Sequence, residues 1–299
     1  MNLIESIPSY RQYLRRKNLS AHTIRNYLHR IQLFVVWVVI PIETVGNENI
    51  KRYIDFLIEK GIVTQSINAH LVAIRRFYTY LQEEEGAQLE NPVHRGMALR
   101  VPSPLPRHLK DTDVTRFFQQ VKKLRDKAIF MLMLRCGLRV DEVAHLTLGV
   151  IDYNRSQIIV RRGKGNKDRV VFISNDAASA LAAYLRKRPA TREQRIFLVE
   201  KGTCRGQPIS VRGIQKRIEY YARKAEFPVS CHQLRHTMAT QLLNADADLV
   251  TIQDLLGHSR ITTTQRYCRV SNNKARRDYY KAMDNILKRE ARNSLASDG

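Results

Sequence analysis

Cysteine is scarce in this chain of 299 residues, where it occupies only positions 136, 204, 231 and 268. These positions are too far apart for a CxxC pair, so the sequence contains neither a zinc-binding pattern nor a disulfide framework. Unpaired thiols are typical of reducing compartments. We therefore expect four reduced cysteines and a cytoplasmic location.

Long apolar runs are also missing. The most apolar stretch, "LFVVWVVI" at residues 33–40, is far shorter than the ~20 residues that a helix needs to cross a bilayer. The opening "MNLIESIPSY" does not look like a secretory signal, and no lipidation motif is found. We expect no membrane partner. The apolar stretch itself predicts a buried helix end, with an interface between protomers as the alternative.

Acidic residues are few relative to basic ones. The chain has 28 Asp and Glu against 51 Lys and Arg, which gives a formal charge of +23 and a pI near 10.2. A positive field of this strength favours a polyanionic partner. Because nothing in the sequence indicates a membrane, nucleic acid is the partner that composition favours.

Residues 1–88 predict a small helical bundle. Ser20 is placed to cap a helix, and apolar residues recur every three or four positions in three successive segments. Arg25, Arg75 and Arg76 lie outside these apolar stripes. A solvated helix face is one interpretation of these arginines. The net charge favours the other, which is contact with the phosphates of DNA.

Residues 89–108 predict a linker, because prolines at 92, 102, 104 and 106 disfavour helix and favour extended chain. A second domain is expected over residues 109–292, followed by a disordered tail at 293–299. Most of this domain predicts helix, but "IIVRRGKGNKDRVVFIS" predicts a hairpin of two β-branched strands. The fold is therefore predicted to be mainly α with a small β-sheet: a helical bundle followed by an α+β domain.

Two polar clusters of the second domain are centred on single basic residues. Arg139, in "CGLRVDEVAHL", follows an apolar helix and a glycine and is expected to begin a new helix. Its charge there needs an acidic or phosphate partner, and a structural ion pair with Glu142 is the alternative to a functional role. Lys164, in "RRGKGNKDR", is expected at the hairpin tip, where Lys167 competes for the same role.

Two further clusters contain histidine. In "CHQLRHTMATQLL", His232, Arg235 and His236 fall on adjoining turns of one helix, at spacings of three and four. A metal pair is the competing interpretation of the two histidines, but neither a third ligand nor an HExxH pattern accompanies them, so we expect no metal. His258 follows a glycine in "LLGHS", where an ordinary histidine at a helix terminus is the alternative.

These side chains together suit the transfer of a phosphoryl group. The transition state gathers charge on its equatorial oxygens, which two arginines can bind through bidentate hydrogen bonds. A lysine can protonate the leaving oxygen, and histidines can donate hydrogen bonds or move protons. A tyrosine near so much positive charge can attack as a phenolate. Tyr267, in "TTTQRYCRV", lies between two arginines and is the candidate, although most tyrosines simply pack in a core.

The order and spacing of these residues resemble the tyrosine recombinase (phage integrase) family. The sequence from about Asp111 to Lys281 is similar to the family's catalytic domain, and the bundle at 1–88 is similar to its core-binding domain. "HQLRHTMATQLL" and "LLGHSRITTTQRY" are the most specific strings. The family signature is a G-x-R-x-x-E box, a hairpin lysine, H-x-x-R, and a G-H pair nine residues before the nucleophile. It matches Arg139, Lys164, His232, Arg235, His258 and Tyr267 in this order.

The resemblance implies a reaction. Tyr267 attacks a DNA phosphodiester, forms a 3′-phosphotyrosyl bond and releases a 5′-hydroxyl. A 5′-hydroxyl of the partner duplex then reverses the step on a new strand, so neither a cofactor nor a metal is needed. The implied roles are phosphate stabilisation by Arg139 and Arg235, hydrogen bonding or proton transfer by His232 and His258, general acid catalysis by Lys164, and support by Glu142 and His236.

The resemblance also implies partners. The family acts as a tetramer on double-stranded DNA, with one dimer per recombination site and C-terminal helices packed into neighbouring copies. The amphipathic pattern of residues 272–290 suits such an exchange, and an intramolecular cap is the alternative. A related recombinase or an accessory protein is a further possible partner. Since the bundle begins near residue 1, no additional arm-binding domain is expected, and the chain looks like Xer proteins or mobile-element integrases.

Two other functions stay open. A topoisomerase or a telomere-resolving enzyme would use the same covalent chemistry without exchanging strands between sites. A DNA-binding accessory protein with a relic site would be non-catalytic, but the complete set of six residues argues against it. The sequence favours a recombinase that integrates, excises or resolves a DNA element.

Overall fold

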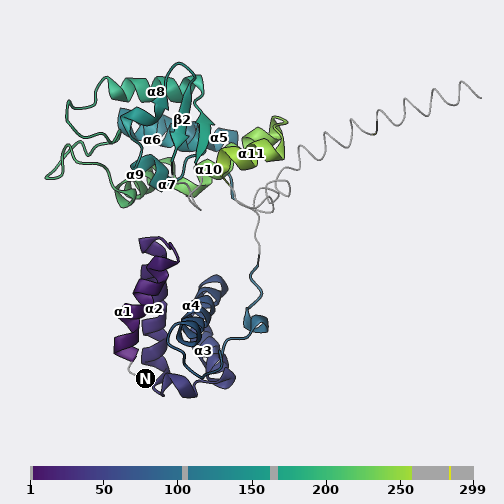
Figure 1. The fold of residues 1–299 in the computed structure, drawn as a ribbon. Coiled ribbons are helices and arrows are strands. Elements are labelled where there is room, and N and C mark those ends of the chain that lie inside the picture. The colour runs from purple at the N-terminus through teal and green to yellow at the C-terminus, as the bar shows by residue number, and fades with distance from the viewer. Residues whose placement is uncertain (1–2, 103–106, 162–167, 258–282, 284–299) are drawn as a thin grey trace, which may run out of the picture. The chain divides into compact units, whose positions relative to one another are not determined.

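The chain divides into two compact units, Met1–Ser103 and Pro104–Gly299 (Figure 1). The computed structural model describes residues 3–102, 107–161, 168–257 and 283. The N-terminal unit consists of helices α1 (Leu3–Arg16), α2 (Ala21–Val38), α3 (Asn47–Glu59) and α4 (Thr64–Glu83), with short 3-10 helices η1 (Ile42–Thr44) and η2 (Arg95–Met97).

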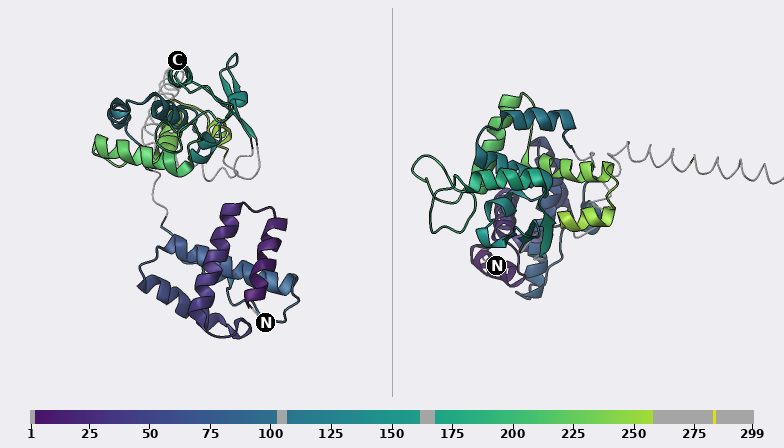
Figure 2. Two further views of the ribbon diagram at one scale, coloured as in Figure 1. Left: turned by 90° about the vertical axis from the view of Figure 1, so that its left-hand side faces the viewer. Right: turned by 90° about the horizontal axis from the view of Figure 1, so that it is seen from above.

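Local signals and apolar periodicity explain the N-terminal bundle. Ser20 caps α2, because its side chain accepts a hydrogen bond from the Thr23 amide at 3.1 Å. Apolar residues at helical spacing fill one core, in which Phe34, Tyr53 and Tyr78 are almost completely buried. Figure 2 shows α4 crossing α2, and the two helices pack together. The predicted helical bundle is confirmed.

The apolar stretch at residues 33–40 is not buried throughout. Phe34 and Val38 face the core, whereas Leu33 is 46% and Val36 is 77% exposed. Successive residues of a helix are rotated by ~100°, so only positions three or four apart can share the core-facing side. The prediction of a buried helix end is therefore wrong for the residues on the other side of α2.

The C-terminal unit is a helical domain with one small sheet. In chain order it contains α5 (Asp111–Gln120), α6 (Leu124–Arg135), α7 (Val140–Ala144), η3 (Leu148–Val150), β1 (Ile151–Asp152), β2 (Gln157–Val160), β3 (Arg169–Phe172), α8 (Asn175–Leu185), α9 (Val211–Ala225), α10 (Cys231–Asn244) and α11 (Leu249–Leu256). The sheet has the order β1-β2-β3 and is antiparallel, with Ile158 opposite Val171 and Val160 opposite Arg169. The predicted hairpin and the mainly α fold with a small sheet are both confirmed.

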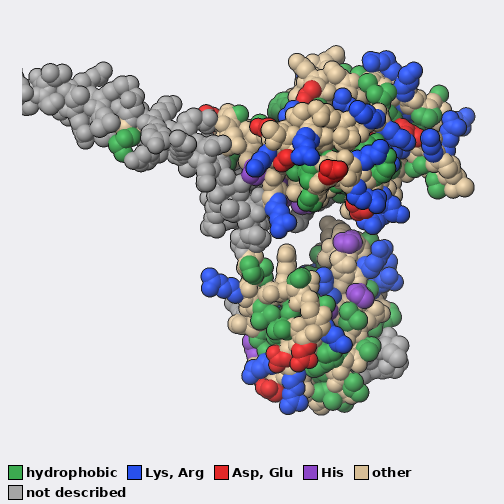
Figure 3. All heavy atoms as spheres, turned by 180° about the vertical axis from the view of Figure 1, so that it is seen from behind, with side chains coloured by type: hydrophobic (Ala, Val, Ile, Leu, Met, Phe, Trp, Pro, Cys, Tyr) green, Lys and Arg blue, Asp and Glu red, His purple; other side chains and the backbone are tan. Residues whose placement is uncertain are grey.

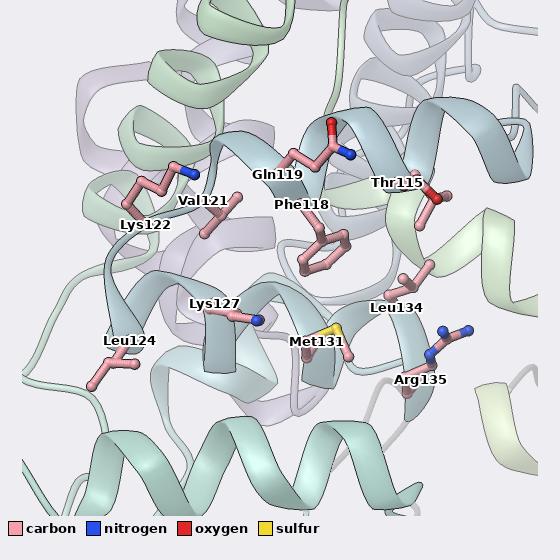
Figure 4. Close-up of a pocket in the computed structure, with 11 residues that line it drawn as sticks. Thr115, Phe118, Gln119, Val121, Lys122, Leu124, Lys127, Met131, Leu134 and Arg135 are labelled. Carbon is pink, nitrogen blue, oxygen red and sulfur yellow. The ribbon is translucent and has the colours of Figure 1, made fainter.

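Helix α6 lies at the centre of this unit. Its residues from Ala128 to Leu134 are buried, because α8 and α10 both pack against it (Figure 1). A groove of about 640 Å³ lies between α6 and α5, and Figure 4 shows Phe118 of α5 together with Met131 and Leu134 of α6 lining it. Within the described part of the chain, no helix is long and apolar enough to cross a membrane.

Candidate active site

The turn after α6 positions Arg139. Gly137 has a φ of +63°, and a Cβ at this position would lie 3.0 Å from the sulfur of Met238 and 3.1 Å from a methyl carbon of Leu256. Glycine is therefore required both by the left-handed backbone and by the close approach of α10 and α11. Arg139 then begins α7, and its amide donates to the Glu142 carboxylate at 2.7 Å. The predicted helix start at Arg139 is confirmed.

Arg235 approaches the same turn from α10. It is 4% exposed, and its guanidinium donates hydrogen bonds to the carbonyls of Gly137 and Leu256. The rings of His232 and His236, on the same helix, meet edge to face with centroids 5.5 Å apart, as their spacing predicts. Among the described residues, no group of three or more His, Cys, Asp or Glu side chains is arranged to hold a metal ion.

The two arginines meet at the C-terminal end of α11. The Leu256 carbonyl accepts from Arg235 and also from Nη2 of Arg139 at 3.3 Å, and the Gly257 carbonyl lies 3.4 Å from the same Nη2. Carbonyls at the end of a helix carry partial negative charge, which stabilises cations placed against them. The fold thus brings together two guanidinium groups that are far apart in sequence.

Glu142 is shared between Arg139 and a third arginine. Its Oε1 accepts from Nη1 of Arg139 at 2.8 Å, so the structural ion pair considered for these two residues is present. Arg169, the first residue of β3, donates from Nη1 and Nη2 to the two carboxylate oxygens at 2.8 and 2.7 Å. Burial raises the pKa of Glu142, but hydrogen bonds and charge from Arg169, and then from Arg139, outweigh it and lower the pKa to about 2.

The ionised state of Glu142 predicts a specific acid sensitivity. Its pKa in the folded chain, about 2, lies below the ordinary value of 4.5, so its stabilising contribution is present above pH 4.5 and is lost as the pH falls towards 2. The shift corresponds to about 3 kcal/mol of unfolding free energy. Urea unfolding followed by far-UV circular dichroism should show this loss. Glu142→Gln should be less stable at pH 7, and its unfolding free energy should fall less than that of the wild type between pH 4.5 and 2. If both chains lost the same unfolding free energy over this range, Glu142 would not be the group responsible.

Arg169 is the residue that sequence reasoning missed. It pairs with buried Val160 across the hairpin, and Val171, two positions later, is also buried, so Arg169 is on the inward face of the sheet. The period of two in "RVVF" could have indicated an inward arginine that needs a carboxylate. The identity of that carboxylate depends on tertiary structure.

Three predicted residues, Lys164, His258 and Tyr267, lie outside the residues that the structure describes. Two of their sequence neighbours belong to the cluster: Gly257 directly precedes His258 and contacts Arg139, and Arg169 follows the hairpin segment that contains Lys164. The structure therefore brings together Arg139, Glu142 and Arg235. The positions of Lys164, His258 and Tyr267 and the roles of His232 and His236 stay predictions.

The three arginines predicted to contact DNA from the N-terminal unit have different surroundings. Arg25 is exposed on α2, and the guanidinium of Arg76 lies 5.7 Å from the centre of a tyrosine ring of α2. Arg75 donates to the carbonyls of Val93 at 3.0 Å and His94 at 2.6 Å. Its guanidinium thus holds the first part of the predicted linker against α4, which is a structural role.

Comparisons with known proteins agree with this geometry. Residues 107–274 match the phage integrase family, and residues 7–85 match the N-terminal SAM-like domain of phage integrases. The tyrosine recombinase XerA of Thermococcus kodakarensis is 33% identical over 280 residues, which cover 93% of this chain and 95% of that protein. The chain belongs to the phage integrase family. Within that family it is a tyrosine recombinase, an enzyme of site-specific DNA recombination.

Solved structures share the fold. The crystal structure of XerA recombinase aligns with a TM-score of 0.54 at 26% identity and covers 93% of this chain and 98% of its own. The XerH site-specific recombinase, in a post-cleavage complex with a palindromic difH substrate, aligns with a TM-score of 0.71 at 18% identity. The alignment covers 88% of this chain and 80% of the XerH chain. The second likeness concerns the fold alone.

Proposed function

We propose that Tyr267 is the nucleophile that cuts DNA, with Arg139 and Arg235 binding the scissile phosphate. The phenolate oxygen forms a bond to phosphorus while the bond to the 5′-oxygen breaks, which leaves a 3′-phosphotyrosyl ester and a 5′-hydroxyl. Attack by a 5′-hydroxyl of another strand releases Tyr267 and rejoins the DNA. The observation that carries this proposal is that Arg139 and Arg235 both donate to the Leu256 carbonyl at the end of α11. Leu256 directly precedes the Gly257-His258 pair in the sequence.

The charge of the cluster suits this reaction. Arg139 and Arg169 both pair with the Glu142 carboxylate, and Arg235 shares the Leu256 carbonyl with Arg139, so the formal charge of these four side chains is 3 − 1 = +2. A phosphodiester carries one negative charge, and a pentavalent transition state concentrates more on the nonbridging oxygens. Fixed cations that face this developing charge stabilise the transition state more than the substrate.

The remaining roles follow from the chemistry of the side chains. Lys164 is the general acid that protonates the departing 5′-oxygen, and His232 and His258 donate hydrogen bonds or move protons. Glu142 supports the arginines through the bonds described above, and His236 supports His232 through their ring contact. The reaction requires neither a metal nor a cofactor for its energy, because the phosphotyrosyl ester retains that of the cut bond.

Double-stranded DNA at a recombination site is the proposed substrate. The net charge of +23 supports it, and Figure 3 shows Lys and Arg side chains spread over the C-terminal unit. We assign the catalytic role to residues 109–292 and DNA contact also to residues 1–88, where Arg25 and Arg76 are better suited than Arg75, which is bonded to backbone carbonyls.

A tetramer on DNA, with a dimer at each site, is the assembly that we propose. The amphipathic pattern at 272–290 supports an exchange between copies. The groove between α5 and α6 is lined by apolar side chains together with Lys122, Lys127 and Arg135 (Figure 4), and such a surface is suited to receive an amphipathic helix. A cytoplasmic location and a second recombinase or accessory protein as partner belong to the same proposal.

Covalent capture on a nicked duplex tests the proposed function. The binding site would first be located by footprinting on host DNA, and a duplex nicked just 3′ to the scissile phosphate would then be offered without ATP and with EDTA. Cleavage releases a short oligonucleotide that diffuses away, so rejoining fails and the protein should stay attached to DNA in denaturing gels. A duplex that is bound but never captured would support the non-catalytic accessory protein. Rejoining without exchange on a two-site plasmid would support a topoisomerase.

A further inference from the structure

We propose that Arg169 is a positioning residue for strand cleavage, which holds Arg139 at the end of α11 through Glu142. The inference rests on the proposed function, in which Arg139 binds the scissile phosphate. Arg169 itself is not proposed to touch DNA, because its side chain is only 8% exposed.

Every nitrogen of the Arg169 guanidinium has a partner in this cluster. Nη1 and Nη2 donate to the two oxygens of Glu142 at 2.8 and 2.7 Å, and Nε donates to the Leu255 carbonyl at 2.9 Å. This bidentate geometry is specific to arginine, since a lysine can offer only a point charge. Arg169 therefore connects β3, α7 and α11, three elements that are separate in sequence.

The stem of Arg169 also packs against Gly257. A Cβ on Gly257 would lie 3.0 Å from Cδ and 3.4 Å from Nε of Arg169, and Gly257 has a φ of +59°. The glycine of the Gly-His pair is thus required by the backbone and by the space that Arg169 occupies. The end of α11, where Arg139 and Arg235 meet, is packed directly against Arg169.

Sharing of Glu142 leaves positive charge available at the site. With Arg169 present, one carboxylate faces two guanidinium groups, so Arg139 is oriented by Glu142 without being fully neutralised. Without Arg169, the carboxylate would pair with Arg139 alone, and the Leu255 carbonyl would lose its side-chain partner. Arg139 would then be both less positive towards a phosphate and less well held at α11.

Arg169→Met should slow cleavage with little effect on DNA binding. We expect the single-turnover rate of covalent capture, measured with saturating protein, to fall roughly 10–100-fold, since small displacements of a positioned catalytic group cost about this much. The capture rate of Arg169→Lys should lie between those of Arg169→Met and the wild type, because lysine keeps the positive charge but cannot form the bidentate hydrogen bonds. Affinity for an intact duplex should change by less than about 3-fold, because the exposed phosphate contacts remain.

A matched control separates positioning from general stability. Arg188 is another partly buried arginine, and it donates to the backbone carbonyls of Glu193, Arg195 and Ile196, away from the cluster. Arg188→Met should lower the melting temperature but leave the capture rate within about 2-fold, measured at a temperature where both variants are folded. If Arg188→Met slowed capture as much as Arg169→Met, the effect would be one of stability and the proposal would be overturned.

A double-mutant cycle tests whether Arg169 acts through Glu142. Glu142→Gln and Arg169→Met should be strongly non-additive, so that the double variant captures DNA little more slowly than the slower single variant. The proposal would be overturned if the reduction in capture rate of the double variant equalled the product of the two single reductions, or if Arg169→Met captured DNA at the wild-type rate. Either result would leave the proposed function intact. No capture by the wild-type chain would instead overturn the proposed function, and this inference with it.

Discussion

Replacing Tyr267 with phenylalanine should abolish covalent capture of the nicked duplex and leave DNA binding unchanged. The substitution removes one oxygen, and in the proposed reaction that oxygen forms the bond to phosphorus. Loss of a nucleophile has no partial substitute, so the rate of capture should fall by more than about 10⁴-fold. Denaturing gels measure capture, and mobility shifts on intact duplex measure binding.

Tyr220 provides the control for this experiment. It lies on the surface of α9, where the Lys224 ammonium hydrogen-bonds to its phenol and, with the charges of Lys224 and Arg217, lowers its pKa. Among the described tyrosines whose pKa is shifted, it is the one shifted downwards, and its ring is exposed, so it is a suitable control tyrosine in that part of the chain. Tyr220→Phe should be captured like the wild type. Capture of Tyr267→Phe together with loss in Tyr220→Phe would reassign the nucleophile.

The elements of the fold that could be predicted are those that depend on local pattern. Ser20 caps α2 and Arg139 begins α7, because capping and helical periodicity are encoded within a few residues. The pairing of β2 with β3, the strands that flank residues 162–167, was predictable for the same reason. Family-like spacing also identified Arg139 and Arg235, which the structure brings to one carbonyl.

Features that depend on contacts between distant segments could not be predicted. The carboxylate that Arg169 requires comes from α7, and the partner of its Nε is a carbonyl at the end of α11. Likewise, the local sequence does not distinguish Asp126, in the first turn of α6, from an ordinary acidic residue near a helix start. Asp126 is completely buried, and besides its neighbour Arg125 its partners are Arg217 and Tyr221 of α9.

Asp126→Asn should destabilise the C-terminal unit by about 3–5 kcal/mol, because it leaves the buried guanidinium of Arg125 and the partly buried one of Arg217 without a counter-charge. Arg125 donates to Oδ1 of Asp126 from Nε at 2.9 Å and from Nη2 at 2.7 Å, while Arg217 and Tyr221 donate to Oδ2 at 2.7 and 3.1 Å. Arg125 is 5% exposed and also donates to the Leu198 carbonyl at 3.0 Å. The carboxylate therefore joins α6 to α9, the helices that lead to the turn at Arg139 and to α10.

The chain offers its own controls for this prediction. Glu219 of α9 forms an ion pair with Arg212 at the surface, and Glu219→Gln should cost no more than about 1 kcal/mol.

The single tryptophan, Trp37, lies in α2, so its fluorescence reports the N-terminal unit while far-UV circular dichroism reports both units. Urea unfolding of Asp126→Asn should shift the dichroism transition to lower urea and leave the fluorescence transition in place. A further variant, Arg125→Met with Asp126→Leu, should recover part of the loss, because it removes the buried charge of Arg125 together with that of Asp126 and leaves unpaired only Arg217, whose side chain is 25% exposed and can be hydrated. Equal destabilisation by Asp126→Asn and Glu219→Gln would show that the buried carboxylate does not hold α6 to α9.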